Sequence, residues 1–388
     1  MEGSGRPRRH HARAPDDLVR RRDDHGAADR TDAVTVGSSP TTWLEPGCHP
    51  VVDGVHRIPL TLPQDGLRAV NVYVLETDSG IALIDGGWHR PDTHRELTEA
   101  LATIGHTPAD IHDVFVTHIH RDHYTFAVEL RRRYGCRVHL GAAEAPGLAE
   151  IARVDSNVPE SSLREVRRAG ARELADTVYA LTIAEPFSID DWEHPDGWLE
   201  PGLLPLPGRR IEAVHTPGHT KGHIVFHDHD HRLSFTGDHI LPTITPSIGF
   251  ELGEWEMPLA KFLRSLELLV DDRGHTIAPA HGAVGGQIGA RAEALLAHHE
   301  HRFSQIVDLL TGRERPLSGH AVAQGLPWTR HNRSLHALDT FNQLIAVCET
   351  MAHLDVLVGR ADVRVDARDG VEYFSVAGSH RSGSPTPH

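Results

Sequence analysis

The segment that most constrains this chain is THIHRDH at residues 117–123, which begins at the last residue of a strand predicted at 113–117. It places three imidazoles and one carboxylate within six residues. In an extended loop His118 and His120 point to the same side, because side chains alternate with a period of two. Asp122 and His123 begin the next turn and can address a second position. The segment therefore predicts a loop that presents ligands to two adjacent metal ions.

Three further motifs follow predicted strands farther along the chain. They are TPGHT at 216–220, FTGDH at 235–239 and PAHG at 279–282. Each contains a potential ligand beside Pro or Gly, which favour sharp turns where the backbone can approach a bound ion. The chain has 32 histidines, so the first motif alone would arise by chance with a probability of about 0.01–0.02. Because three further motifs with potential ligands follow along the chain, a chance match is a poor explanation.

The chain between residues 51 and 286 shows the alternation of strands and helices that is typical of a layered α/β domain. A β-hairpin is predicted at 70–84, because two β-branched runs flank the turn sequence TDSG at 77–80. Further strands are predicted at 113–117, 137–140, 211–214, 223–227, 232–235 and 275–278, and helices at 91–104, 127–134 and 255–270. Residues 146–191 are more polar and helical in pattern, and we interpret them as an insertion that serves as a lid or a dimer contact.

The residues after 288 predict a second unit. A long amphipathic helix from 289, helices at 317–326 and 335–357, and a hairpin across Asp369-Gly370 together suggest a winged helix. Residues 1–45 have too few apolar side chains to offset their ordering entropy. The predicted domains are a disordered tail at 1–45, a catalytic domain at 46–288 with the insertion at 146–191, a winged-helix-like domain at 289–380 and a disordered tail at 381–388.

The net charge of -15 lies almost wholly in residues 46–288, because 1–45 contains eight Arg and eight Asp or Glu, and 289–388 contains ten Arg and eleven Asp or Glu. An acidic catalytic domain repels a phosphate backbone, so we do not expect nucleic-acid binding. No apolar run approaches the ~18 residues that span a bilayer, and we expect no secretory signal. The three cysteines lack a CxxC spacing, which favours a reducing, cytoplasmic location.

Most other histidines have a simpler interpretation. We expect the alternating histidines of His227–His231 to form a solvated polar turn between two strands. We expect His298, His299 and His301 to lie on the polar face of a helix. For the predicted winged helix, packing, homodimerisation or lining of the substrate cleft is favoured over nucleic-acid binding, because it contains no lysine.

In their order and spacing, these motifs resemble the metallo-β-lactamase-fold hydrolases from about Val51 to Gly286, and the C-terminal unit resembles the lactamase-β-like-2 group. The resemblance implies a four-layer αββα sandwich followed by a winged-helix-like domain. It implies a first metal ion on His118, His120 and His219, a second on Asp122, His123 and His281, and a bridge through Asp238. Asp85, in LIDGG at 83–87, would support the ligand loop as a hydrogen-bond acceptor, and His239 is a lesser candidate for a supporting donor.

The resemblance also implies the chemistry. Two divalent ions, zinc in preference to iron or manganese, would activate a bridging hydroxide that cleaves an ester, thioester or lactone bond of a small-molecule acyl substrate. Asp122 would be catalytic, as a ligand that also orients or relays a proton. Asp238 stands where secreted β-lactamases of this fold place cysteine, and His120 where flavodiiron oxygen reductases place an acid. A metal-dependent endoribonuclease and a noncatalytic binding protein remain the alternatives.

Overall fold

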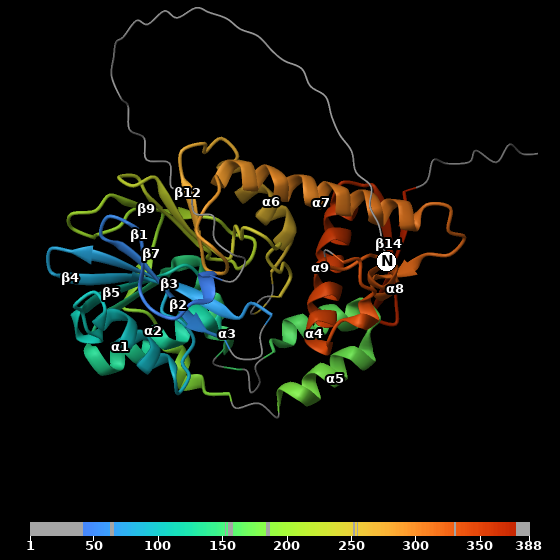
Figure 1. Ribbon diagram of the computed structural model, residues 1–388. Coiled ribbons are helices and arrows are strands. Elements are labelled where there is room, and N and C mark those ends of the chain that lie inside the picture. Colours follow the sequence, from blue (N-terminus) through green and yellow to red (C-terminus); the bar gives the residue numbers. More distant parts are fainter. Residues whose placement is uncertain are drawn as a thin grey trace, which may run out of the picture. The chain divides into compact units, whose positions relative to one another are not determined.

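The computed structural model describes residues 42–377 except 63–65, 152, 154–157, 184–186, 251–252, 254 and 330 (Figure 1). The tail predicted at 381–388 and residues 1–41 of the tail predicted at 1–45 lie outside the described residues. Within them, no helix is both long and apolar enough to cross a membrane. Cys48, Cys136 and Cys348 are free thiols.

The first sheet contains seven strands in sequence order. Strands β1 to β4 are antiparallel neighbours, whereas β4, β5, β6 and β7 pair in parallel. The hairpin predicted at 70–84 is confirmed as β3 and β4. The bounds are β1 His49–Val52, β2 Val55–Thr61, β3 Ala69–Thr77, β4 Gly80–Ile84, β5 Ile111–Val116, β6 Arg137–Gly141 and β7 Gly197–Leu199.

The second sheet contains five strands in the order β12-β11-β10-β9-β8. Strands β8 to β11 are antiparallel neighbours, and β12 pairs in parallel with β11. Because β11 and β12 are parallel, the loops that follow them leave the same edge of this sheet. The bounds are β8 Gly202–Leu203, β9 Ile211–His215, β10 Ile224–Asp228, β11 Leu233–Gly237 and β12 Thr276–Pro279.

Alternation of side chains along the strands builds the layers. Along β3, Tyr73 and Leu75 pack with the second sheet, whereas Val72 and Val74 pack with helices on the other face. Those helices are α1 Thr93–Ala102 and α2 Arg121–Tyr134. On the second sheet, Val225 joins a cluster with α6 Pro258–Leu269 and α7 Ile288–Leu310. The layers are therefore helix, sheet, sheet, helix, which confirms the predicted αββα sandwich (Figure 1).

The C-terminal part contains three helices and a small sheet. Helix α7 contacts α6, α8 and α9, and β15 is the central strand of the sheet β13-β15-β14. Its designation as a winged helix stays a prediction. The bounds are α8 Gly319–Gly325, α9 Thr340–Gly359, β13 Leu317–Ser318, β14 Val363–Arg368 and β15 Val371–Val376.

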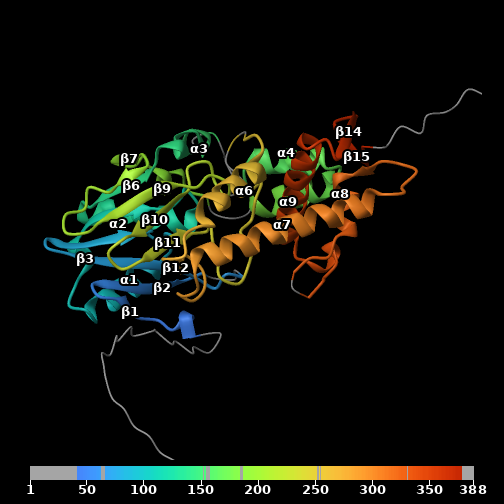
Figure 2. The same cartoon turned by 90° about the horizontal axis from the view of Figure 1, so that it is seen from above.

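The segment predicted as an insertion contains α3 Ala145–Ile151, α4 Glu160–Arg168, α5 Arg172–Thr182 and the 3-10 turn η4 Ile189–Trp192. Helices α4 and α5 both contact α9, and Figures 1 and 2 show α4 beside α9. Leu163 and Val166 share a buried cluster with residues of α9, and the Arg168 guanidinium lies 2.7 Å from the carboxylate of Asp355. The apolar faces of α4 and α5 are therefore buried against the C-terminal part.

Two predictions about surplus histidines are wrong in part, because each set contains a buried member, whereas the other histidines of both sets are partly or fully exposed. His227 and Asp228 lie in β10 and are buried, as the strand predicted at 223–227 implies for His227, whereas His229, Asp230 and His231 form the predicted turn. His299 is buried in α7, with its ring centroid 5.1 Å from that of His353 in α9. Packing between α7 and α9 covers this histidine, which helical periodicity alone had placed on a polar face.

Candidate metal centre

The first histidine motif forms the connection between β5 and α2. His118 follows the last strand residue by two positions, and His120 is the residue that precedes the first turn of α2. Asp122 and His123 lie in that first turn, where the backbone N–H of His123 donates to the carbonyl of His120 at 3.0 Å. The chain therefore changes from strand to helix between the pair His118 and His120 and the pair Asp122 and His123, as the spacing predicted.

The remaining predicted ligands lie in three loops at strand ends. His219 lies in the β9–β10 connection, Asp238 directly follows β11, and His281 follows β12 by two residues. Gly218 adopts φ +153°, and a Cβ there would lie 2.4 Å from the Cα of Phe262 in α6. Only glycine fits this close approach, which fixes the turn that carries His219.

Three of the predicted ligands form one compact set of nitrogens. Nδ1 of His120 lies 3.1 Å from Nε2 of His118 and 3.0 Å from Nε2 of His219. The three residues offer donor atoms that all lie within 4.8 Å of one another. The structure thus brings together the set that the resemblance assigned to a first metal ion.

Asp122, His123 and His281 form a second set with the same mutual limit of 4.8 Å. Oδ2 of Asp122 lies 3.5 Å from Nε2 of His281 and 3.6 Å from Nε2 of His123. Asp238 lies between the two sets, since its Oδ2 is 3.5 Å from Nε2 of His219 and its Oδ1 is 3.2 Å from Nε2 of His281. One carboxylate therefore faces both sets with different oxygens.

The outward nitrogens of the histidines determine which nitrogen faces the centre. Nδ1 of His219 donates to the carbonyl of Ser247 at 2.8 Å, and Nδ1 of His281 donates to the carbonyl of Ala69 at 2.8 Å. Because a carbonyl can only accept, each Nδ1 carries a proton, so Nε2 is the nitrogen that faces the centre and would bind a metal ion once it is deprotonated. Nδ1 of His123 makes the equivalent bond to Asp85 at 3.0 Å.

The inward atoms lack partners. Nε2 of His123, Nε2 of His281 and Oδ1 of Asp238 are buried and make no aligned hydrogen bond within the described residues. Buried donors and acceptors are almost always satisfied, and an unsatisfied one costs about 1–3 kcal/mol. Convergent lone pairs and carboxylates without partners are the surroundings that a divalent cation satisfies, so the residues present fit the metal that the sequence predicted.

The histidines of the two sets differ in their pKa values, because burial and neighbouring charges act on them differently. Burial lowers the pKa of His118, His120 and His219, in His120 to about 3, so these imidazoles are neutral. Burial also opposes protonation of His281, but the carboxylates of Asp238 and Asp122 raise its pKa well above the usual range. The carboxylates of Asp122 and Asp238, next to neutral imidazoles, therefore attract positive charge in the form of protons or metal ions.

Asp85 holds the ligand loop from behind. Its Oδ1 accepts the backbone N–H of Thr117 at 2.8 Å, while its Oδ2 accepts Nδ1–H of His123. The residue adopts φ +64°, an uncommon conformation for aspartate that costs about 1 kcal/mol or more and persists only where surrounding contacts require it. Asp85 thus has the supporting contacts that the sequence predicted for it.

His239 does not make the supporting hydrogen bond that was predicted for it. Both its ring nitrogens are buried without a hydrogen-bond partner among the described residues, and its ring packs 4.8 Å from that of Phe262. His223 makes the contact instead, because its Nε2 accepts the backbone N–H of Asp238 at 3.2 Å and its Nδ1 lies 3.0 Å from the Thr216 hydroxyl. His223 thereby fixes the backbone from which the Asp238 side chain extends.

Glu144 was missed by the sequence analysis. This buried residue follows β6, and its Oε1 accepts the hydroxyl of Thr220 at 2.5 Å, next to His219. Backbone N–H groups of Ile119 and Gly222 also stabilise its carboxylate, although burial dominates and raises its pKa to about 7. One side chain therefore ties the loop of His118 and His120 to the loop of His219, and no motif marks it.

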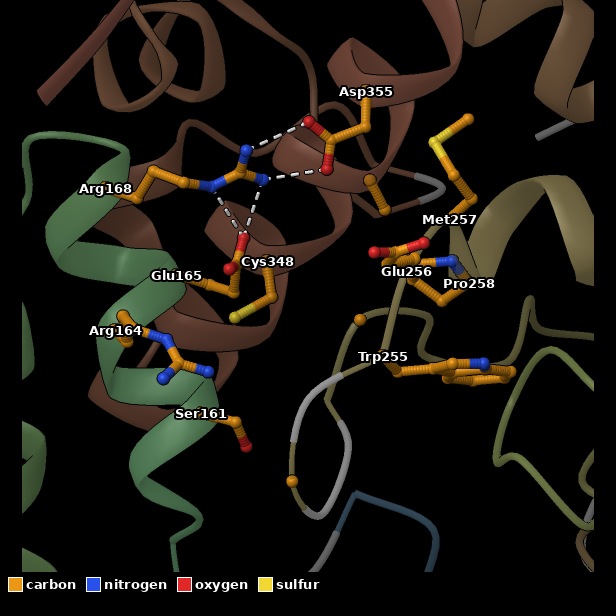
Figure 3. A pocket seen from close by; sticks show the side chains of 13 residues that line it. Ser161, Arg164, Glu165, Arg168, Trp255, Glu256, Met257, Pro258, Cys348 and Asp355 are labelled. Carbon is orange, nitrogen blue, oxygen red and sulfur yellow. Dashed lines mark hydrogen bonds and ion pairs between the residues drawn. The ribbon is translucent and has the colours of Figure 1, made fainter. Parts of the chain in front are cut away.

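A cavity of about 580 Å³ lies between α4, α9 and the segment that leads into α6. Figure 3 shows Arg168 bound to Asp355 and Glu165 on one side, and Trp255 and Met257 on the other. None of the seven predicted ligands lines it. The segment that forms its wall also supplies Ser247, which anchors His219, and Phe250, whose ring lies 6.2 Å from that of His120.

An αββα sandwich that gathers imidazole and carboxylate donors at its strand ends defines a metal-dependent hydrolase. The family model described as the Metallo-beta-lactamase superfamily matches residues 65–281, which is more than half of the chain. The chain belongs to this superfamily, and the predicted resemblance is confirmed.

Two similar proteins are named as hydrolases of different substrates. A hydroxyacylglutathione hydrolase from Haemophilus influenzae is 25% identical over 199 residues, which cover 51% of this chain and 79% of the relative. An atrochrysone carboxyl ACP thioesterase from Aspergillus fumigatus is 22% identical over 248 residues, which cover 64% of this chain but only 46% of the relative.

Among solved structures, a metallo-beta-lactamase family protein from Thermus thermophilus is 26% identical, with a TM-score of 0.68. The match covers 84% of this chain and 100% of that protein. Such coverage exceeds the residues 65–281 that the family model matches, so the structural likeness extends beyond the family region.

Proposed function

We propose that the protein is a dinuclear zinc-dependent hydrolase that cleaves the thioester bond of a small-molecule acyl substrate. The observation that carries the proposal is the position of Asp238, whose two oxygens face two separate sets of donors. His118, His120 and His219 would hold one ion, Asp122, His123 and His281 the other, and Asp238 would bridge them. When bound, two such ions supply an acidified water nucleophile and polarise a carbonyl.

The chain's own residues would orient the reaction. Thioester hydrolysis adds water to the acyl carbon, breaks the C–S bond, and leaves a carboxylic acid and a thiol. Asp122 is suited to accept and relay the proton of the water, because its side chain is 17% exposed, compared with 10% for Asp238. The hydrogen bonds of Asp85, Ser247 and Ala69 would keep the imidazoles aligned during this step.

Two observations favour a small acyl substrate. Phe250 and Trp88 flank the first ligand loop, where Phe250 lies beside His120 and the Arg121 guanidinium lies 4.1 Å from the Trp88 ring centroid. These apolar surfaces suit an acyl chain better than a polyanion, and the charge of -15 opposes RNA. Two of the similar proteins are named for thioester substrates, namely the hydroxyacylglutathione hydrolase and the ACP thioesterase.

The experiment incubates zinc-loaded protein with acyl-CoA thioesters, lactoylglutathione, acyl-homoserine lactones, aryl esters and single-stranded RNA. We expect thiol release from at least one thioester, and loss of that activity in His120→Ala. The exposed Asp78→Asn variant, in the β3–β4 turn, is the control and should match the wild-type protein. Cleavage of RNA without cleavage of any thioester would reverse the assignment in favour of an endoribonuclease.

A further inference from the structure

A second group of imidazole and carboxylate donors lies away from the catalytic cluster. It consists of His227 in β10, Asp272 in the connection after α6, and His275 directly before β12. One donor atom of each lies within 4.8 Å of the donor atoms of the other two. We propose that these three side chains form a separate binding site for a divalent transition-metal ion such as zinc.

The strand topology separates this group from the catalytic centre. Strands β11 and β12 run in parallel and carry Asp238 and His281 after their last residues, whereas His275 precedes the first residue of β12. A strand of four to five residues spans about 15 Å at ~3.3 Å per residue. The two sites therefore occupy opposite ends of the same strands and share no donor.

The carboxylate of Asp272 is already aimed at both imidazoles. Its Oδ2 lies 2.8 Å from Nδ1 of His275 and 3.9 Å from Nδ1 of His227. The His227 side chain is only 8% exposed, and that of His275 15% exposed. Nδ1 of His227 also lies 2.6 Å from the Ser234 hydroxyl, a contact that an ion bound at this nitrogen would replace.

One atom in the group has no role in the fold. Nε2 of His275 is buried and has no hydrogen-bond partner among the described residues. The turn explains the bonds that Asp272 accepts from the backbone N–H groups of Gly274 and His275, at 3.0 and 3.1 Å. It does not explain the unpartnered nitrogen, which lies in a group that His227 joins from another strand, with its ring centroid 4.9 Å from that of His275.

Two imidazoles and one carboxylate are a ligand set that zinc accepts, with a fourth position left for water or another side chain. His229 lies beside the group, with its ring centroid 5.5 Å from that of His275, and its Nε2 is held by Glu212 at 2.8 Å. An ion here would join the β10–β11 hairpin to the α6–β12 connection. It would thereby brace the strands that position Asp238 and His281.

The test counts zinc ions per chain in the full-length protein, loaded with zinc, desalted and measured by elemental analysis. The conservative variants are Asp272→Asn, which keeps an acceptor for the turn, and His275→Gln. The control is His231→Ala, in the β10–β11 turn, where Nδ1 of His231 lies 2.9 Å from Asp228 outside the group. We expect each conservative variant to lose one ion per chain, and the control to lose none.

Equal zinc content in the wild-type protein and both conservative variants would overturn the proposal. If a variant fails to fold, shown by near-UV circular dichroism, anomalous diffraction from zinc-saturated wild-type crystals decides. We expect a peak about 2.0–2.2 Å from an imidazole nitrogen of both His227 and His275, and the absence of that peak would overturn the site.

Discussion

Oδ1 of Asp238 lies 3.2 Å from Nε2 of His281, and both atoms are buried without an aligned hydrogen bond in the described part of the chain. The two groups attract each other by charge, but they are not aligned for a hydrogen bond, which leaves both atoms free to face a common third point. The same carboxylate reaches His219 with its other oxygen at 3.5 Å. Asp238 is therefore the residue on which a two-ion centre depends most.

Replacement of Asp238 by Ala should remove the bridge between the two donor sets. We expect the zinc content to fall by at least one ion per chain and kcat/KM to fall at least about 100-fold, which corresponds to ~2.7 kcal/mol of transition-state stabilisation. Elemental analysis and thioester hydrolysis measure the two effects. Full activity with full zinc content in this variant would contradict the assignment.

Replacement of Asp85 by Asn should weaken the second donor set selectively. The amide can still accept from Thr117, but it no longer provides the carboxylate that orients His123. Loss of such supporting contacts typically costs 10–100-fold in metal affinity or activity, so we expect about this loss for the ion at the set that contains His123. Zinc titration against a competing chelator measures it, and an unchanged affinity would show that Asp85 serves the backbone alone.

Glu144 should make stability depend on pH. Its pKa is raised to about 7 by burial, so its stabilising, protonated form is complete below the ordinary value of 4.5 and is lost as the pH rises through 7. Glu144→Gln cannot ionise and should gain on the order of 2 kcal/mol relative to the wild-type protein between pH 5 and pH 8.

Urea unfolding at several pH values measures this difference. Glu150→Gln is the control, because Glu150 is a partly exposed partner of Arg153 and its replacement should give a difference independent of pH. A flat difference for Glu144→Gln as well would show that the Glu144 carboxyl is not desolvated.

Gly218→Ala should disturb the centre through packing. The added Cβ would lie 2.4 Å from the backbone of Phe262, in a conformation that favours glycine. We expect a loss of at least about 2 kcal/mol in the free energy of unfolding, together with weaker zinc binding through His219. Gly66→Ala, where a Cβ would meet nothing within 4 Å, is the matched control for both measurements.

The sequence predicted the donor set because each donor lies in a short motif at a strand end. His118 and His120 have the spacing of extended chain, and Asp238 directly follows a fully buried strand. Parallel pairing of β11 with β12 then brings distant motifs to one edge. The local motifs therefore identify the donors, and the strand topology brings them together at this centre.

Contacts between distant segments could not be predicted in this way. Glu144 meets Thr220 across 76 residues, and although Thr220 ends the TPGHT motif, no motif contains Glu144. The sequence places His227 at the end of a predicted strand but gives no sign of its burial, which comes from the neighbouring segments that cover β10 as far as Asp228. The packing of α4 and α5 on α9 depends equally on tertiary contacts, which no local periodicity reveals.

The central claim, two adjacent ions bridged by Asp238, is tested most directly by anomalous diffraction at the zinc edge from crystals of zinc-loaded protein. The account predicts two peaks among the seven donors, about 3.5–4 Å apart, with one oxygen of Asp238 bound to each. A single peak, or two peaks with Asp238 bound to only one, would contradict it.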